Sequence, residues 1–222
     1  MIHILVAART SSTRLPNKHF LKLGKLSVIE HVVRRCEHFG FKPFICVPKG
    51  DEDAFNEHTS CIDVFGGDPD NVEARLMECA IENKIDIFHQ LDGDDPFFSR
   101  EMVVESMQCF LRGRFSRILP SVASQSGLAL CGTSYNLKAQ KDWTQETLPD
   151  PATCVWPQRL TLDYEEDYQL LCAVNRMVGG YVAPRWAVDD LFVRNPDLHK
   201  INWFRNEEWK DKQFHERPRI NL

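Results

Sequence analysis

Short apolar runs mark four strands in the first half of the chain. Residues 2–8 are apolar at almost every position, which is typical of a strand buried on both faces of a parallel sheet. Three further runs predict strands at 42–47, 62–65 and 85–91. Polar stretches follow each run, so we expect loops and helices between the strands.

Amphipathic helices fit between these strands. Three of them begin behind residues that can cap a helix N-terminus, namely Ser27, Asp70 with Glu73 in a capping box, and Ser99. Gly40 lies where the C-terminal glycine of the first helix belongs. Strands that alternate with helices predict βαβ units. The first 120 residues are therefore expected to be α/β, with a mostly parallel sheet covered by helices on both faces.

The pattern changes in the second half of the chain. A strand is predicted at 127–135, and residues 144–157 form a polar, proline-containing excursion, so 121–157 is expected to be an arm or a dimer-forming insertion. Helical patterns return at 163–178 and, as one or two short closing helices, at 184–203. The last 15 residues are highly charged and are expected to fray. No linker or repeat divides the sequence, so residues 1–222 are expected to form a single domain.

Composition allows a sizeable core and excludes several classes of protein. Hydrophobic residues make up 43% of the 222 positions, yet no window holds 18 consecutive apolar residues, so we expect neither a membrane span nor a membrane partner. No secretory signal pattern opens the chain. The eight cysteines are never closer than ten residues apart, so no CxxC spacing exists. We expect them to be small core residues of a cytoplasmic protein.

Charge is distributed unevenly along the sequence. The net charge of −5 argues against a nucleic-acid partner, which normally requires a basic surface. However, no acidic residue precedes Glu30, while the first 25 residues hold five lysines and arginines. This asymmetry indicates that the start of the chain faces something anionic.

The basic residues lie in the loop that follows the first strand. Arg9, Arg14 and Lys18 are interspersed with four hydroxyl residues, Thr10, Ser11, Ser12 and Thr13. Ligands of α/β sheets bind at the carboxyl ends of strands, and guanidinium and ammonium groups bind phosphate oxygens, so a triphosphate is the expected partner. An ordinary solvated basic loop explains the same spacing.

Carboxylates follow two other predicted elements. Asp92, Asp94 and Asp95 lie in a turn directly after a buried strand, and crowded carboxylates favour a bound cation such as Mg²⁺. Aspartate, glycine and proline are also common in simple turns. Asp163 is a candidate second metal ligand, but it could equally cap the next helix, with Glu166 completing a capping box.

Taken together, these segments resemble a known family. The order Arg9-x4-Arg14-Leu-Pro-x-Lys18, Gly93-Asp94-x-Pro96 and Leu160-x-Leu162-Asp163 is similar to that of the sugar-acid cytidylyltransferases, which include the CMP-Kdo and CMP-acylneuraminate synthetases. Within them, the chain looks closest to the spore-coat-polysaccharide branch. The resemblance covers about residues 2–175 and implies a three-layer, Rossmann-like sheet of the nucleotide-diphospho-sugar transferase type.

The resemblance also implies roles for individual residues. Lys18, Arg9 and Asp94 match catalytic positions, and Asp94 and Asp163 match the family's two Mg²⁺ ligands. The residues that would lie beside the nucleotide are Ala7, Ala8, Arg9, Thr10, Ser11, Arg14, Lys18 and Asp92. Asp92 stands where related enzymes often carry Gln or Thr.

The implied reaction is transfer of CMP from CTP to the anomeric hydroxyl of an acidic sugar, with release of pyrophosphate. The acceptor carboxylate needs a cationic partner, for which Arg75, Arg159 and Arg117 are candidates that the sequence does not rank, since any of them could be an ordinary surface ion-pair residue. No residue is expected as general base. A homodimer is expected from the resemblance, through residues 121–157.

Two alternatives remain open at this point. One is a nucleotidyltransferase that uses another nucleotide or another acceptor, since its phosphate and metal groups would be the same. The other is a nucleotide-binding domain of the same fold without catalytic activity. The intact set of Arg9, Lys18, Asp94 and Asp163 argues against the second.

Overall fold

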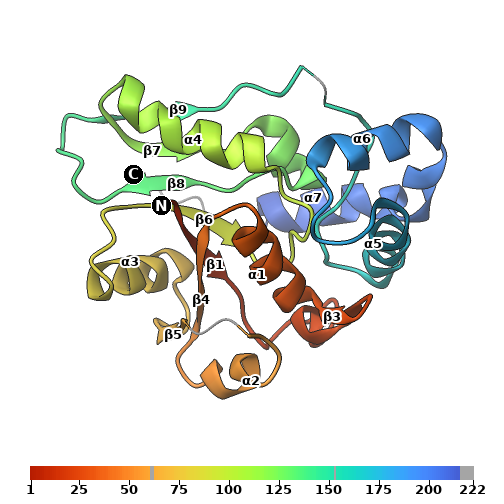
Figure 1. Ribbon diagram of the computed structural model, residues 1–222, viewed down its shortest axis with the longest axis horizontal. Coiled ribbons are helices and arrows are strands. Elements are labelled where there is room, and N and C mark those ends of the chain that lie inside the picture. Colours follow the sequence, from red (N-terminus) through yellow and green to blue (C-terminus); the bar gives the residue numbers. More distant parts are fainter. Residues whose placement is uncertain (61–62, 153, 216–222) are drawn as a thin grey trace.

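A seven-stranded sheet forms the centre of the computed structural model, which describes residues 1–60, 63–152 and 154–215 (Figure 1). The strand order is β5-β4-β1-β6-β8-β7-β9. In chain order the strands are β1 (His3–Ala7), β4 (Lys42–Pro48), β5 (Val64–Gly67), β6 (Ile87–Asp92), β7 (Phe115–Leu119), β8 (Ser134–Asn136) and β9 (Thr144–Thr147). Within the described part of this sheet, β8 alone runs antiparallel to its neighbours. The expected mostly parallel α/β sheet is confirmed.

Helices cover both faces of the sheet. They are α1 (Val28–His38), α2 (Glu52–Asn56), α3 (Val72–Glu82), α4 (Arg100–Arg112), α5 (Glu165–Val178), α6 (Arg185–Arg194) and α7 (Asn206–His215). Ile4 and Val6 of β1 pack in one core cluster with α1 and α4, whereas Leu5 packs in another with α3. Successive side chains of β1 therefore enter opposite cores, which explains why the run is apolar at every position.

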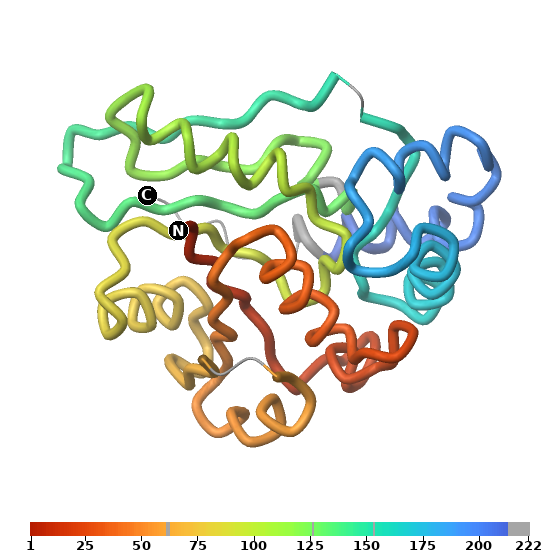
Figure 2. Tube along the Cα trace, in the orientation of Figure 1, coloured from red at the N-terminus to blue at the C-terminus, as the bar shows by residue number. Residues whose placement is uncertain are grey.

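A third apolar cluster lies beyond the carboxyl end of the sheet. Leu15 of the first loop packs there with Leu162, Leu170 of α5 and Val188 of α6. In Figures 1 and 2 α5 and α6 lie together at one end of the molecule, near the segment that follows β1. This cluster draws the first loop toward the segment before α5.

Local capping signals predicted two of three helix starts correctly. The side chains of Ser27 and Ser99 accept hydrogen bonds from the backbone N–H groups of Glu30 (3.1 Å) and Met102 (3.3 Å). The capping box predicted at Asp70 and Glu73 is wrong. Asn71 caps α3 instead, accepting from the N–H of Ala74 at 3.1 Å, because Asp68 accepts the N–H of Asp70 and turns the chain one residue later.

The strand predicted at 127–135 is also wrong over most of its length. Ser124–Leu128 forms a π-helical turn, and Ala129 has a left-handed backbone conformation (φ 55°). The Ser124 hydroxyl accepts from the N–H groups of Leu130 and Cys131, which holds this turn together. Only Ser134–Asn136 joins the sheet, and it does so antiparallel.

Two further segments, one in each half of the chain, form strands. Part of the expected polar arm forms β9, whose four residues are all exposed. β9 pairs with β7, and the sequence pattern did not predict β7. A hairpin of β2 (Lys22–Leu23) and β3 (Leu26–Ser27) was also not predicted. The dimerisation role of 121–157 stays a prediction. Of the last 15 residues, 208–215 belong to α7, whereas residues 216–222 lie outside the described residues, so the expected fraying stays a prediction.

The burial of the cysteines and the lengths of the helices can be compared with the expectations drawn from composition. Five cysteines are buried, as expected of small core residues: Cys36, Cys46, Cys79, Cys109 and Cys131. Cys154 and Cys172 are partly exposed, and Cys61 lies outside the described residues. Across the described ranges, no helix has the length and apolar character needed to span a membrane.

His89 is a buried structural group in the middle of β6. Its Nδ1 lies 2.8 Å from the Ser134 hydroxyl, and its Nε2 accepts from the backbone N–H of Gly132 at 3.1 Å. Gly132 has no room for a side chain, since a Cβ would lie 2.1 Å from the carbonyl oxygen of Gln90. Burial lowers the pKa of His89 to about 3. The ring is therefore neutral, as its acceptor role at Nε2 requires.

This environment predicts acid sensitivity of the fold. Between pH 6.5 and about 3, unfolded His89 binds a proton that the folded ring does not, so the free energy of unfolding falls with decreasing pH, by about 1.4 kcal/mol per pH unit for this group. The His89→Gln variant should lack this contribution to the pH dependence of the free energy of unfolding, measured by urea unfolding between pH 6 and pH 4. His38 is exposed, so His38→Gln serves as the control and should show the same pH dependence of unfolding as the wild type. Equal slopes in H89Q and wild type would contradict the assignment.

Candidate active site

The two chemistry-bearing loops leave the sheet side by side. β1 and β6 are parallel neighbours, and Ala7 lies opposite Asp92 at their carboxyl ends. The N–H of Gly93 donates to the carbonyl oxygen of Ala7 at 2.9 Å. A Cβ on Gly93 would lie 3.1 Å from both Ala8 and the His19 ring, so glycine allows the two loops to approach closely.

Lys18 occupies the centre of a cluster of opposite charges. Its ammonium group donates to the carboxylate of Asp94 and, at 2.9 Å, to Oδ1 of Asp163. Arg14 donates to the same Oδ1 at 2.7 Å. The N–H of Leu162 donates to the carbonyl oxygen of Asp94 at 2.9 Å, which joins the segment before α5 to the turn after β6. Four predicted site residues from three distant segments therefore meet.

Burial and charge act against each other in this cluster. Burial alone would lower the pKa of Lys18, but the carboxylates of Asp94 and Asp163 raise it above its usual range. Burial would raise the pKa of Asp94, but Lys18 and His19 lower it. Burial, followed by the charge of Lys18, lowers the pKa of His19 to about 4, so this ring is neutral at pH 7. The ionised forms of Lys18 and Asp94 are held in place by each other.

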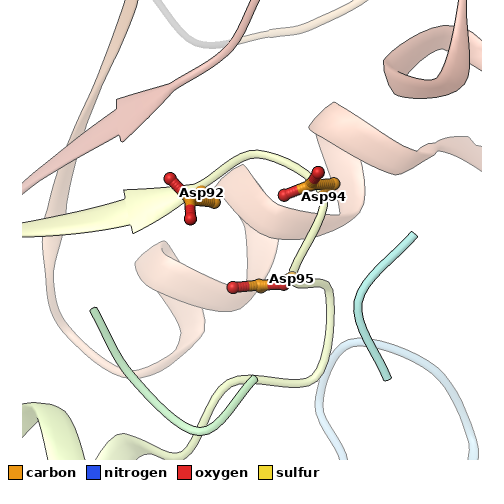
Figure 3. Close-up of side chains that lie close together, drawn as sticks. All are labelled: Asp92, Asp94 and Asp95. Carbon is orange, nitrogen blue, oxygen red and sulfur yellow. The ribbon is translucent and has the colours of Figure 1, made fainter. Parts of the chain in front are cut away.

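A second concentration of carboxylates surrounds Asp94. Figure 3 shows Asp92 at the end of β6, with Asp94 and Asp95 on the turn that follows. Carboxylate oxygens of the three residues lie within 4.8 Å of one another. Burial, then the charges of Asp94 and Asp92, raises the pKa of Asp95 well above its usual range. Asp95 Oδ1 has no hydrogen-bond partner within the described ranges.

These oxygens fit a hard divalent cation. Asp94 and Asp163 both contact the single Nζ atom of Lys18, so one positive charge placed between them is already shared by the two carboxylates. An all-oxygen donor set with two or more carboxylates is the kind that Mg²⁺ and Mn²⁺ take. The residues present therefore suit the expected metal.

Hydrogen bonds with residues that the sequence did not single out hold the side chain and backbone of Asp163 in place. Its Oδ2 accepts from Nε1 of Trp209 at 2.7 Å. Its backbone N–H and that of Tyr164 donate to the carboxylate of Asp167, at 2.9 and 3.0 Å. The predicted capping box of Asp163 with Glu166 is thus wrong: Tyr164 precedes the first helical residue, and Asp167 reaches back. Asp163 is left available for the site.

The three candidate arginines differ in their partners. Arg159 is fully buried and binds Asp167 through Nε and Nη2, at 2.9 and 3.1 Å. Arg117 pairs with Glu73. Arg75 is 2% exposed, and its Nε and Nη1 atoms have no hydrogen-bond partner within the part of the chain that the structure describes. Arg159 lies next to the site, since its Nη2 is 3.6 Å from Oδ2 of Asp163, and its Nη1 also has no hydrogen-bond partner among the described residues.

The remaining predicted residues line the first loop. Ala7 ends β1, Ala8 is buried next to Gly93, and Arg9 and Ser11 are exposed. Thr10 is engaged with the protein, since its N–H and hydroxyl both donate to the carboxylate of Asp51, at 2.8 and 3.0 Å.

Several contributors to the site escaped sequence reasoning. Asp95 received no role of its own, although its place beside Asp94 was a usable signal. Asp167 lies in the acidic run after Asp163. Trp209 is 46 residues from Asp163, and no spacing rule connects the two.

The charge cluster predicts a large effect of removing its central cation. Lys18→Met leaves the partly buried Asp94 without its ion-pair partner and leaves buried Asp163 with Arg14 and Arg159, so the free energy of unfolding at pH 7 should fall by about 3 kcal/mol. Adding Asp94→Asn to this variant should recover part of the loss. Urea unfolding measures both effects, with Lys25→Met, an exposed lysine of the same segment, as control. A loss equal to that of K25M would contradict the cluster's role.

Comparisons with known proteins agree with this architecture. A sequence model described as cytidylyltransferase matches residues 3–119. No curated protein matches the sequence. A cytidylyltransferase structure from Leptospira borgpetersenii serovar Hardjo-bovis is similar, with 19% identity, a TM-score of 0.78 and coverage of 89% of this chain and 96% of that one.

Two more distant structures share the fold. The CMP:2-keto-3-deoxy-manno-octonic acid synthetase complexed with CTP has 13% identity and a TM-score of 0.57, covering 79% of this chain and 99% of that one. The Mycobacterium tuberculosis protein Rv0371c in complex with manganese has 12% identity and a TM-score of 0.54, covering 78% and 97%. The matched segment 3–119 includes Lys18 and Asp94, whereas Asp163 lies outside it.

Proposed function

Because the chain belongs to the cytidylyltransferase family, we propose that it transfers CMP from CTP to the anomeric hydroxyl of an acidic sugar, with release of pyrophosphate and dependence on Mg²⁺. One observation carries this proposal: two basic residues of the first loop meet two carboxylates from distant segments at the carboxyl end of β1 and β6. Cations and metal-binding carboxylates at that edge of a sheet are what a nucleoside triphosphate requires.

The basic residues bind the triphosphate. Arg14 and Lys18 lie at the site with their charged groups together, and exposed Arg9 lies on the same loop. Attack of the sugar hydroxyl in line on the α-phosphorus breaks the bond to pyrophosphate, and negative charge develops on the departing oxygen. Fixed cations stabilise that charge without reorganising during the reaction.

Asp94 and Asp163 hold the divalent cation. Mg²⁺ bound there supplies positive charge against the phosphate oxygens. The complex of a structurally related protein with manganese supports a divalent ion at this kind of site. With the hydroxyl and the phosphate held together, positioning provides much of the rate enhancement, and the geometry assigns no side chain as general base.

Ligand binding requires an exchange of partners. In this structure Arg14 and Lys18 neutralise the same carboxylates that would hold the metal. Asp94 and Asp163 would bind the metal ion, and Arg14 and Lys18, released from these carboxylates, would bind the phosphates. Each ligand therefore removes the electrostatic cost of binding the other, so CTP and metal should bind cooperatively.

An acidic acceptor is supported by the resemblance to sugar-acid cytidylyltransferases and by one structural relative. That relative is a synthetase of the CMP derivative of a keto-deoxy sugar acid. A carboxylate on the acceptor needs a cation, and Arg75 is the candidate we choose because two of its buried donors, Nε and Nη1, have no partner among the described residues, against one, Nη1, for Arg159. Buried donors without partners are costly, so a ligand that completes them is favoured.

The decisive experiment measures pyrophosphate release from CTP, UTP, GTP and ATP with a panel of sugar acids and neutral sugars. CTP with a sugar acid and Mg²⁺ should be turned over. Asp94→Asn should lower kcat by about 10²-fold or more, because a charge contact in the site is lost. Asp86→Asn is the matched control, since Asp86 pairs with Lys138 on the surface. Turnover with another nucleotide or only neutral sugars would reject the proposed specificity, and near-wild-type turnover of D94N would reject the role of Asp94.

The role of Arg75 has its own test. Arg75→Met should raise the KM for the sugar acid by about tenfold, the effect of losing one hydrogen bond to a charged group, and should change the KM for CTP little. Arg117→Met, which removes a surface ion pair with Glu73, should leave both constants unchanged. An increase confined to the KM for CTP would contradict this role and would indicate that Arg75 contacts the nucleotide and not the acceptor.

A further inference from the structure

We propose that Trp209 is a positioning residue for Asp163, so that the C-terminal helix α7 completes the active site. This inference rests on the proposed function, because it assigns Asp163 to the metal and nucleotide. The observation behind it is the hydrogen bond of 2.7 Å from the indole Nε1 to Oδ2 of Asp163. Asp163 is 3% exposed and Trp209 is 8% exposed, so water is largely excluded from this bond.

The two oxygens of Asp163 have different partners. Oδ1 faces the site and accepts from Arg14 and Lys18. Oδ2 faces away and accepts from Trp209, while Nη2 of Arg159 lies 3.6 Å from it, beyond hydrogen-bond distance. The indole therefore selects the rotation of the carboxylate that presents Oδ1 to Lys18.

The nature of the donor matters as much as its position. An indole N–H satisfies a buried carboxylate oxygen without bringing a formal charge. A lysine or arginine in its place would neutralise Asp163 and reduce its affinity for a cation. Trp209 therefore orients Asp163 and preserves its negative charge for the ligand, as outer hydrogen-bond partners of metal ligands do.

Helix α7 is anchored in a way that keeps Trp209 in place. Arg205, which precedes α7, binds the carboxylate of Glu166 at 3.1 and 3.0 Å and that of Glu208 at 2.8 Å. The guanidinium of Arg159 stacks on the Trp209 ring at 4.9 Å from its centroid. The helix is thus tied to the start of α5, the same segment that carries Asp163.

The first experiment compares Trp209→Phe with Trp203→Phe in the full chain. Phenylalanine keeps a ring in the packed site but removes the donor. Trp203, six residues before Trp209 and outside α7, packs edge-on against Trp156. In W209F the Mg²⁺ concentration for half-maximal rate should rise about 10- to 100-fold and kcat should fall, with little change in the KM for CTP at saturating Mg²⁺. W203F should match wild type. Values for W209F within twofold of wild type would overturn the proposal.

A second readout does not depend on turnover. The five tryptophans give five indole N–H resonances in a ¹⁵N-labelled sample, and that of Trp209 is assigned by its loss in W209F or by elimination with the other four Trp→Phe variants. Asp163→Asn should shift this resonance upfield, since a neutral amide is the weaker acceptor. Addition of Mg²⁺ with CTP should also shift it.

These outcomes separate the two proposals. A Trp209 resonance that does not respond to Asp163→Asn overturns the positioning role, whatever the reaction. If no nucleotide or sugar is turned over but the resonance responds to Asp163→Asn and to Mg²⁺ with CTP, the positioning role stands and the proposed reaction fails. Should W209F fail to fold, Asp163→Asn in the wild-type background still decides the matter.

Discussion

The ammonium group of Lys18 between two buried carboxylates is the interaction on which the site depends. Removing charged groups from water is costly, and only mutual compensation makes it tolerable. Lys18 pairs with Asp94 and Asp163, and Arg14 adds a second positive charge, so the cluster is neutral as a whole. Such a balanced set can exist without ligand and can still exchange its internal partners for a metal ion and phosphates.

Backbone interactions bring these charges together. β1 and β6 are adjacent in the sheet, which places the first loop beside the turn of Asp94. Glycine at position 93 lets that turn touch Ala8 and His19, and the N–H of Leu162 on the carbonyl of Asp94 attaches the segment that carries Asp163. The apolar cluster under α5 and α6 then holds this segment against the first loop. Apolar packing thus supplies the stability that the buried charges do not.

Local signals made much of the fold predictable. The fully apolar run of β1 and the caps at Ser27 and Ser99 depend on neighbours in sequence, and the structure confirms them. The expected strand at 127–135 was wrong because a turn around Ser124, closed by its hydroxyl, competes with extension. In the site, the loop and the aspartates were identified from residue types. Partners such as Trp209 could not be, since they lie close to Asp163 only in three dimensions.

The segment matched by the family model is not sufficient for a complete site. Residues 3–119 contain Lys18, Arg14 and Asp94, but the second carboxylate, Asp163, comes from beyond them. The carboxylate of Asp163 accepts a hydrogen bond from Trp209 of α7, which lies still closer to the C-terminus. The first half of the chain therefore provides the basic loop and one carboxylate, while the second half closes the charge cluster. Because the indole of Trp209 holds the second oxygen of Asp163, the proposed active site includes the C-terminal helix as well as the charged groups.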